Sequence, residues 1–369
     1  MTITKVTDAG LDRTRLVTPI IINGDMSVAQ RATSVTGQTG AGIYTVDRMR
    51  LSPGGGMTFT VAQASESPTG QGFTKSYKLT STTGDSSMSS SEYNIPLQMR
   101  MEGNVLQSIR KGTSNAQKIT FAFWVYATVT GTYVLELSDD DNSRYNSQSY
   151  TISSASTWEK KIVTFPADTT GAFDNDNASS LECEWFLGAG STYTSGAVPT
   201  SWEAESAGDR AAGLTVNLGD STSNEWYITG VQLEAGQVAS DFEFLPIDVN
   251  LERCKRYFQT KGTSLSPNAF TNNQTVAMGL ARTVSQAQCY MELNPIMRSE
   301  PTVSGIGTLS NLKCHTATGG NVNTSSIGSD GTPNRQQVTY LANNLTSGLN
   351  DNQPIRLYGD YTITFDAEL

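Results

Sequence analysis

The chain has 369 residues, a length that suits two ordinary domains or one large all-β domain. Charged residues make up 16% of it, and short apolar runs alternate with stretches rich in Gly, Ser, Thr and Asn, which predicts an all-β protein. The formal net charge of -10 belongs to the residues before Asp248, because acidic and basic residues balance from there onward. Such an acidic surface repels phosphate backbones, so we expect no nucleic acid partner.

The cysteines and the apolar runs exclude two further classes of protein. Cys183, Cys254, Cys289 and Cys314 lie far apart without a CxxC pair, so neither a zinc finger nor a dense disulfide framework is expected. No window approaches 18 apolar residues, and a polar segment follows Met1. We therefore expect no membrane insertion and no signal peptide, with synthesis in a cytoplasm.

The chain opens with a polar segment, residues 1–17, that lacks strong periodicity. We expect an extended arm that docks the protein on a partner, with Leu11 and Leu16 as its apolar anchors. From Thr18 a short strand is predicted to end in the turn signal Asn23-Gly24, and an alternating strand follows at 43–51. Further strands are predicted at 57–62, 73–80, 118–127, 132–137, 149–152, 158–165, 181–187, 214–218 and 226–234.

The clearest pattern is "KITFAFWVYATVTGTYVLEL" at 118–137, two alternating strands joined by a Thr-Gly turn. It predicts a hairpin whose inward residues include Phe121, Phe123 and Val125, whereas Trp124 is out of phase and points to the opposite face. About ten strands with frequent turns predict a two-sheet jelly roll over residues 18–247.

The character of the sequence changes after this region. In "DVNLERCKRYF", residues 248–258, Leu251, Cys254 and Phe258 recur at helical spacing, which predicts a short helical linker capped by Asp248 or Asn250. A second, smaller β-sandwich is expected over 259–369, and its last strand is expected to pair with neighbouring strands in a sheet. Because residues 248–369 carry no net charge, we expect this C-terminal part to form the oligomer contact.

Several short motifs occur in an order that resembles a known family. "IIINGDM" near the start is followed by "AQR" and "DR", and "WYITGVQLEAG" is followed by "FE", "RYF" and "MRSEP". The chain resembles the carbohydrate-binding-module type of jelly roll found in bacteriophage tail-fibre and virion surface proteins. The resemblance spans almost the whole chain and implies that the first and last strands of the jelly roll lie side by side.

The resemblance also implies a function. It indicates a bacteriophage virion structural protein at the virion surface, a tail-fibre-like appendage for host-surface recognition and attachment. The partners it implies are other virion proteins, host cell-surface glycan and further copies of the chain in a trimer. Three alternatives stay open: a capsid-decorating protein, a polysaccharide-degrading virion enzyme, and a plain carbohydrate-binding module of a secreted enzyme.

The sequence offers little for catalysis. His315 is the single histidine, so a Ser-His-Asp or Cys-His arrangement would depend on it alone, and a site with two histidine ligands is excluded. Glu182 and Glu184 share one side of a predicted strand at roughly 7 Å, close to the spacing of an inverting glycosidase. Neighbouring acids on a solvated β face are the commoner case, and we predict no catalytic residues and no enzyme.

Two kinds of binding site remain. The run Asp139 to Asp141 lacks the spacing of a calcium loop and predicts a solvated hairpin tip. The resemblance implies a structural calcium at Asp25, although Thr229-Gly230 stands where that family often has Asp; no other cofactor is expected. Tyr193 and Trp202, on a Gly/Ser/Thr-rich loop, are candidates for stacking on a glycan, and the alternative for Trp202 is to pin the loop to its own sandwich.

Overall fold

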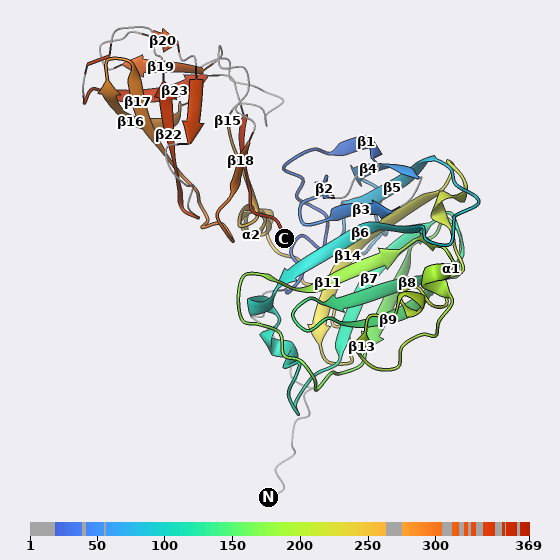
Figure 1. Ribbon diagram of the computed structural model, residues 1–369. Coiled ribbons are helices and arrows are strands. Elements are labelled where there is room, and N and C mark those ends of the chain that lie inside the picture. Colours follow the sequence, from blue (N-terminus) through green and yellow to red (C-terminus); the bar gives the residue numbers. More distant parts are fainter. Residues whose placement is uncertain are drawn as a thin grey trace, which may run out of the picture.

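The computed structural model describes residues 19–38, 42–54, 57–262, 275–304, 312–316, 321–323, 326–329, 335–343, 349–350, 352–359 and 362–369. These residues form antiparallel sheets with few and short helices (Figure 1). Two large hydrophobic cores are present, one built from residues between Ile21 and Leu233 and the other from residues between Ala277 and Ala367. The predicted all-β class is confirmed.

The first core lies between two sheets that form a β-sandwich. The six-stranded sheet has the order β1 (Ser34–Gln38), β4 (Thr58–Ala64), β5 (Ser76–Thr83), β14 (Glu225–Ala235), β7 (Ile119–Ala127), β10 (Glu159–Phe165). The larger sheet has the order β13 (Glu203–Ala204), β9 (Arg144–Ile152), β8 (Gly131–Asp139), β11 (Ser179–Phe186), β6 (Tyr93–Glu102), β3 (Arg50–Gly54), β2 (Ile43–Tyr44), and β12 (Gly188–Ala189) pairs with β6.

Alternation along the strands fills this core with aromatic side chains. Phe121 and Phe123 of β7 are fully buried, and each packs edge-on against Trp185 of β11 with ring centroids 6.0 Å apart. Trp226 of β14 is also fully buried. Because aromatic pairs of this geometry add to the gain from burial, they hold the two sheets face to face.

The predicted hairpin at 118–137 is wrong. β7 belongs to the six-stranded sheet and β8 to the larger one, so the Thr-Gly turn carries the chain across the sandwich. β8 instead pairs with β9, in register from Gly131 opposite Ile152 to Asp139 opposite Arg144. A period of two fixes which side chains face the core, but it does not fix which strand lies alongside.

Two predicted strands are absent from the described residues. The segment from Pro19 to Met26 forms bends and a turn, because the buried Asn23 side chain donates to the carbonyls of Val28 and Asp47 in place of a strand ladder. Residues 214–217 are irregular, and Leu218 begins a short 3₁₀ helix. Conversely, the ten-residue strand β6 is present in the structure but was not predicted from the sequence.

The opening segment contacts the last strand of the sandwich without pairing with it as a strand. β14 lies between β5 and β7, whereas β1 lies at the edge of the sheet, so these two strands are not neighbours. The N–H of Val231 in β14 donates to the carbonyl of Gly24 at 2.9 Å. A Cβ atom on Gly24 would lie 2.1 Å from the Val231 carbonyl oxygen, so this approach requires glycine.

Helix α2 (Ile247–Lys255) follows the first sandwich. Its N-cap position is Pro246, without a side-chain cap, so the expected caps Asp248 and Asn250 are wrong. Asn250 is buried, and its side-chain Oδ1 accepts a hydrogen bond from the backbone N–H of Asn23 at 3.1 Å, because the helix packs against the start of the sandwich.

The second core lies between two further sheets. The three-stranded sheet has the order β15 (Phe258–Gly262), β24 (Thr362–Asp366), β18 (Thr302–Ser304). The seven-stranded sheet has the order β20 (Asn321–Asn323), β19 (Leu312–Thr316), β23 (Pro354–Gly359), β16 (Thr275–Thr283), β17 (Gln286–Glu292), β22 (Gln337–Asn343), β21 (Ser326–Ser329). The last strand, β24, is therefore paired on both sides.

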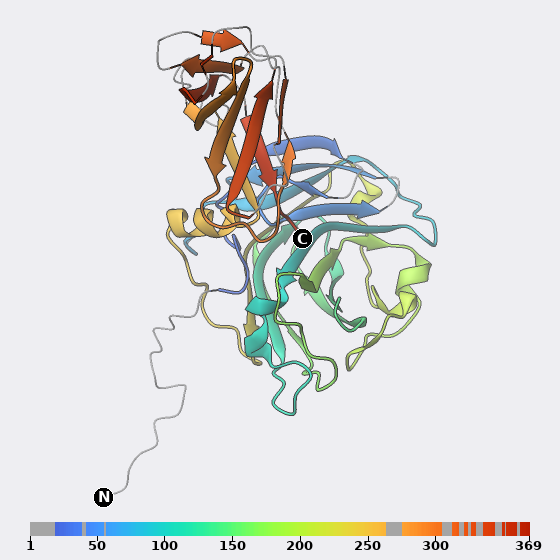
Figure 2. The ribbon, with the colours of Figure 1, turned by 60° about the vertical axis from the view of Figure 1, so that its left-hand side comes forward.

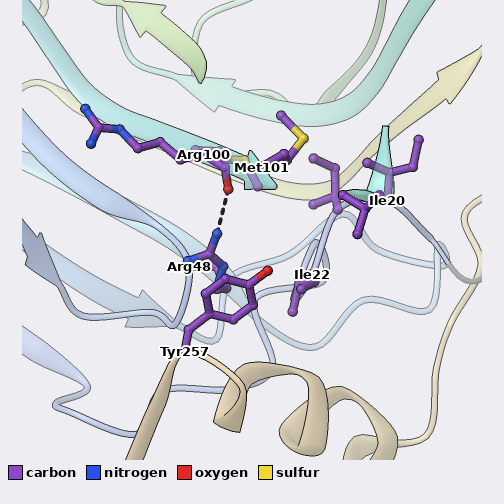
Figure 3. Close-up of a pocket in the computed structure, with 9 residues that line it drawn as sticks. Ile20, Ile22, Arg48, Arg100, Met101 and Tyr257 are labelled. Atoms are coloured by element: carbon purple, nitrogen blue, oxygen red, sulfur yellow. Dashed lines mark hydrogen bonds between the residues drawn. The ribbon is translucent and has the colours of Figure 1, made fainter. Parts of the chain in front are cut away.

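Charged residues join the two sandwiches where the C-terminus returns to the first one (Figures 1 and 2). The guanidinium of Arg48 lies 3.6 Å from the ring centroid of Tyr257 and donates to the carbonyl of Arg100 (Figure 3). It also pairs with Glu368. Nearby, Arg256 donates to the fully buried Glu102. A buried charge is costly unless it is paired, so these contacts favour one fixed junction.

Candidate functional site

The outer face of the six-stranded sheet carries aromatic side chains that the core does not use. Phe121, Phe123 and Val125 of β7 point into the core, which leaves Trp124 and Tyr126 on the outer face. Both are partly exposed. The alternation of the sequence had already placed Trp124 opposite the core residues.

Three rings from three different segments meet on this face. Tyr126 of β7 lies 5.0 Å from Tyr227 of β14 and 5.8 Å from Trp158, which directly precedes β10; Trp158 and Tyr227 lie 6.1 Å apart, all measured between ring centroids. We call Tyr126, Trp158 and Tyr227 the aromatic cluster. Tyr227 is buried beneath the other two, which remain partly exposed.

A charged pair borders the aromatic cluster. Lys78 of β5 and Glu225 of β14 form an ion pair at 2.8 Å, and the Tyr227 hydroxyl donates to Glu225 at 2.8 Å. The ammonium of Lys78 lies 4.9 Å from the centroid of the Tyr227 ring, within reach of a cation–π interaction. The cluster is thus apolar in its centre and polar along one edge.

The charge states of this edge follow from its contacts. Burial raises the pKa of Tyr227 to about 12, so its hydroxyl stays protonated. Burial alone would raise the pKa of Glu225, but the hydrogen bonds from Lys78 and Tyr227 and the charge of Lys78 together outweigh burial and lower that pKa. At neutral pH the edge therefore presents an ammonium, a carboxylate and a hydroxyl in fixed positions.

Such a surface suits a ligand with apolar and hydroxyl-bearing sides. The faces of aromatic rings are negative, and the C–H groups of sugar rings are weakly positive, so sugars stack on exposed rings. Donors and acceptors at the border can then bind hydroxyl groups. The aromatic cluster was not predicted from the sequence. Tyr227 directly follows the buried Trp226 in a strand, and this spacing places its side chain on the outer face.

The structure places the two predicted glycan-binding residues elsewhere. Tyr193 lies in α1 (Ser191–Thr194) and packs edge-on against Tyr93 with centroids 5.1 Å apart, over the outer face of the larger sheet. Trp202 is only 4% exposed, and its indole N–H donates to the carbonyl of Pro166 at 2.8 Å. Its ring is covered, so Trp202 fits the alternative role of pinning the loop.

The acids of β11 do not form a solvated face, and that expectation is wrong. Glu182 and Glu184 are both buried, and Glu184 lies opposite the fully buried Glu136 of β8. The guanidinium of Arg210 donates to Glu136 at 2.9 Å and to Glu184 at 2.7 Å, and Arg100 pairs with Glu182 at 3.1 Å. We call Glu136, Glu182 and Glu184 the acidic cluster.

Burial and crowding of carboxyl groups make this cluster hold protons tightly. Burial, followed by the charge of Glu184, raises the pKa of Glu182 to about 7; burial, followed by the charge of Glu136, raises the pKa of Glu184 to about 7. Both oxygens of the Glu184 carboxyl group accept hydrogen bonds, from the Gln98 amide at 2.6 Å and from Arg210 at 2.7 Å. The acidic cluster is thus occupied by partners from the chain itself.

The turn between β8 and β9 also differs from the solvated tip expected for Asp139 to Asp141. Asp139 is fully buried and pairs with the buried ammonium of Lys111, which lies 3.0 Å from Asp168 as well. Asn142 donates from its backbone N–H to Asp139 at 3.1 Å. Asp140 remains exposed. Buried acids of this kind hold the loop in place through a paired cation.

The carboxylate of Asp25 already accepts hydrogen bonds from other groups of the chain. One of its carboxylate oxygens accepts from the Ser27 hydroxyl at 3.0 Å and from the Asn250 amide at 3.0 Å. Within the described residues, no group of three or more His, Cys, Asp or Glu side chains could hold a metal ion. The surroundings of Asp25 therefore do not fit the calcium site that the resemblance implies.

The remaining candidates from the sequence are His315, the four cysteines and the two leucines of the arm. His315 lies in β19, opposite Arg356 of β23 and Asn321 of β20. The four cysteines are free and buried. Leu11 and Leu16 fall outside the described residues. No helix in the described parts of the chain is long and apolar enough to cross a membrane.

Comparisons with known proteins show similarity at the level of solved structures. No family model and no curated protein sequence matches the chain. The enzymatically active domain of tailspike protein 4 from bacteriophage CBA120 is 12% identical, with a TM-score of 0.31 over 60% of this chain and 21% of that one. This chain thus spans about a fifth of that structure.

Two further similar structures contain carbohydrate-binding modules. A CBM4 structure is 9% identical, with a TM-score of 0.26 over 58% of this chain and 97% of that one. The CBM22-1-GH10 modules of Clostridium thermocellum xylanase 10B are 13% identical, with a TM-score of 0.25 over 54% of this chain and 28% of that one. The class that the fold itself defines is an all-β protein of two joined sandwiches.

Proposed function

We propose that this chain is a bacteriophage virion protein, a tail-fibre-like appendage at the particle surface, and that its aromatic cluster binds host cell-surface glycan. The observation that carries the glycan part is the meeting of Tyr126, Trp158 and Tyr227 on the outer face of a sheet, beside the Lys78–Glu225 pair. The order of the sequence motifs supports the virion part.

The position of the aromatic cluster favours binding over a purely structural role. Tyr227 is itself buried beside Tyr126, and the core on the other side of β7 is complete without Tyr126. Rings held by strands and by one another lose little freedom when a ligand stacks on them. Partial exposure of Tyr126 and Trp158 therefore serves a ligand better than it serves stability.

The acidic cluster supports a binding protein over a polysaccharide-degrading enzyme. Its carboxyl groups are buried and paired with two arginines, so none of them is placed to protonate a leaving oxygen while another receives water. A capsid-decorating role is the alternative within the virion class. Locating the chain in a map of the intact particle distinguishes the head surface from the tail.

The glycan proposal is tested by binding of the full chain to polysaccharide from the host envelope, measured by isothermal titration calorimetry. Tyr126→Ala and Trp158→Ala should each weaken binding about tenfold, which corresponds to about 1.4 kcal/mol for one lost stacking partner. The control is Ile162→Ala, an exposed apolar residue of β10 on the same sheet that is not part of the aromatic cluster.

Circular dichroism checks that each variant is folded. Unchanged affinity of folded Tyr126→Ala and Trp158→Ala, or an equal loss with Ile162→Ala, would place the glycan site elsewhere. A wild-type chain that binds none of the host glycans would contradict the glycan part of the proposal and leave the position in the particle to be judged from the map.

A further inference from the structure

Strand β16, in the middle of the seven-stranded sheet of the second sandwich, has an inverted distribution of apolar side chains, whereas its neighbours β17 and β23 bury large ones such as Met291 and Leu357. The core side of β16 is lined by Ala277, Gly279 and Ala281, which are the small residues of the strand. The outer side carries Met278, which is 67% exposed, and Leu280, which is 47% exposed. A sheet face that meets water normally shows the opposite pattern, with large apolar residues inside.

The close approach of β17 explains the glycine on the core side of β16. A Cβ atom on Gly279 would lie 1.8 Å from the carbonyl oxygen of Gln288, so a larger residue cannot stand there. Nothing comparable requires large apolar residues on the outer side, where charged or polar ones would fit. The outer Met and Leu therefore point to a surface that another molecule covers.

The neighbouring strand extends this apolar surface. Tyr290 of β17 is 45% exposed and lies directly opposite Met278, and Pro354 of β23 is exposed and lies opposite Leu280. Residues opposite one another on adjacent strands share a face of the sheet. Met278, Leu280, Tyr290 and Pro354 thus form one continuous patch, which we call the outer apolar patch.

Charge favours a second copy of the chain as the partner. The residues from Asp248 onward carry no net charge, whereas those before it carry all of the -10, so two copies meeting through this sheet avoid most of their repulsion. Arg282 lies at the turn end of the β16–β17 hairpin and Glu292 at the opposite end, and both are exposed. A two-fold axis that lies in the interface, perpendicular to the strands, exchanges the two ends of the hairpin. It would therefore bring Arg282 near Glu292 of the second copy.

The outer apolar patch lies on three of the seven strands, so a stable contact has to extend over the rest of the outer face of the sheet. Seven strands at a spacing of about 4.8 Å make a sheet about 34 Å wide, and strands of about six residues are about 20 Å long. The resulting face, roughly 700 Å² before the relief of side chains is added, approaches the ~800 Å² that each partner buries in an interface of standard size.

We propose that the outer apolar patch is covered by the same patch of a second copy of this chain, related by a two-fold axis. This contact is isologous, since each copy contributes the same residues, and it closes as a dimer. It does not depend on glycan binding, because the aromatic cluster lies on the other sandwich. It also differs from the trimer that the family resemblance implies.

Sedimentation velocity of the full chain tests the proposal. Wild type should sediment as a dimer at micromolar concentration, and Met278→Glu should weaken the dimer at least about 100-fold, because it places a charge in an apolar contact. Val238→Glu is the matched control: Val238 is an exposed apolar residue of the first sandwich, and the charge change is the same. This control should remain a dimer.

A cross-linking variant gives a second measurement that does not rely on disruption. All four native cysteines are buried, so Leu280→Cys adds an exposed thiol, and a short bis-maleimide should join two chains. Val238→Cys should not cross-link. A monomeric or trimeric wild type, a dimer that survives Met278→Glu, or equal cross-linking of both cysteine variants would overturn the proposal.

Discussion

The acidic cluster should make the stability of this protein fall as pH rises from about 4.5 to about 7, and Glu184→Gln should remove part of that dependence. Glu182 and Glu184 have pKa values raised from 4.5 to about 7 in the folded chain. A carboxyl group with a raised pKa stabilises the fold fully below its unfolded pKa. That contribution is lost as pH rises through the folded pKa, because the folded state then has to release a proton that it binds more tightly.

The expected size follows from the shift. Because the charge of Glu184 is one cause of the raised pKa of Glu182, the two groups titrate as a coupled pair, and we count a single shared proton. Each pKa unit corresponds to 1.36 kcal/mol, so the rise from 4.5 to about 7 amounts to about 3 kcal/mol of unfolding free energy lost over this window. Such a change is a large part of the stability of an ordinary domain.

The assay is urea unfolding of wild type and Glu184→Gln at several values between about pH 5 and pH 8. The difference in unfolding free energy between the two proteins should shift by up to about 3 kcal/mol in favour of the variant as pH rises. Glu243→Gln, at an exposed position, is the control and should follow wild type. Parallel curves for wild type and Glu184→Gln would refute the reasoning, since the shared proton would then have no energetic consequence.

Three further predictions concern catalysis, the junction and the arm. Incubation with host envelope glycans should release no reducing ends, and ends that appear with wild type but not with Glu182→Gln would show an enzyme. Glu102→Ala should lower the unfolding free energy by about 3 to 5 kcal/mol in urea melts, because it leaves Arg256 without its buried partner; a loss below about 1 kcal/mol would contradict this. Deleting residues 2–16 should leave Tm within a few degrees, because the first core begins at Ile21, and should abolish incorporation into particles; normal occupancy would place docking elsewhere.

The sequence by itself determined the local features of the fold. Alternation at 118–127 identified β7 and separated the inward Phe121 and Phe123 from the outward Trp124, because successive side chains of a strand point to opposite faces. The same rule located β14 and placed β24 in a sheet. These features depend only on neighbouring residues, so a single sequence contains them.

Only the tertiary structure decided which segments meet. The two-residue period of a strand showed on which face of the sheet Tyr126 lies. It could not show that Trp158 and Tyr227 lie beside Tyr126, because β10, β7 and β14 become neighbours only by pairing across long stretches of chain. Glu182 and Glu184 appeared as a solvated pair for the same reason. Their burial depends on Glu136 and Arg210, which other segments bring to the same place, and no local pattern records that meeting.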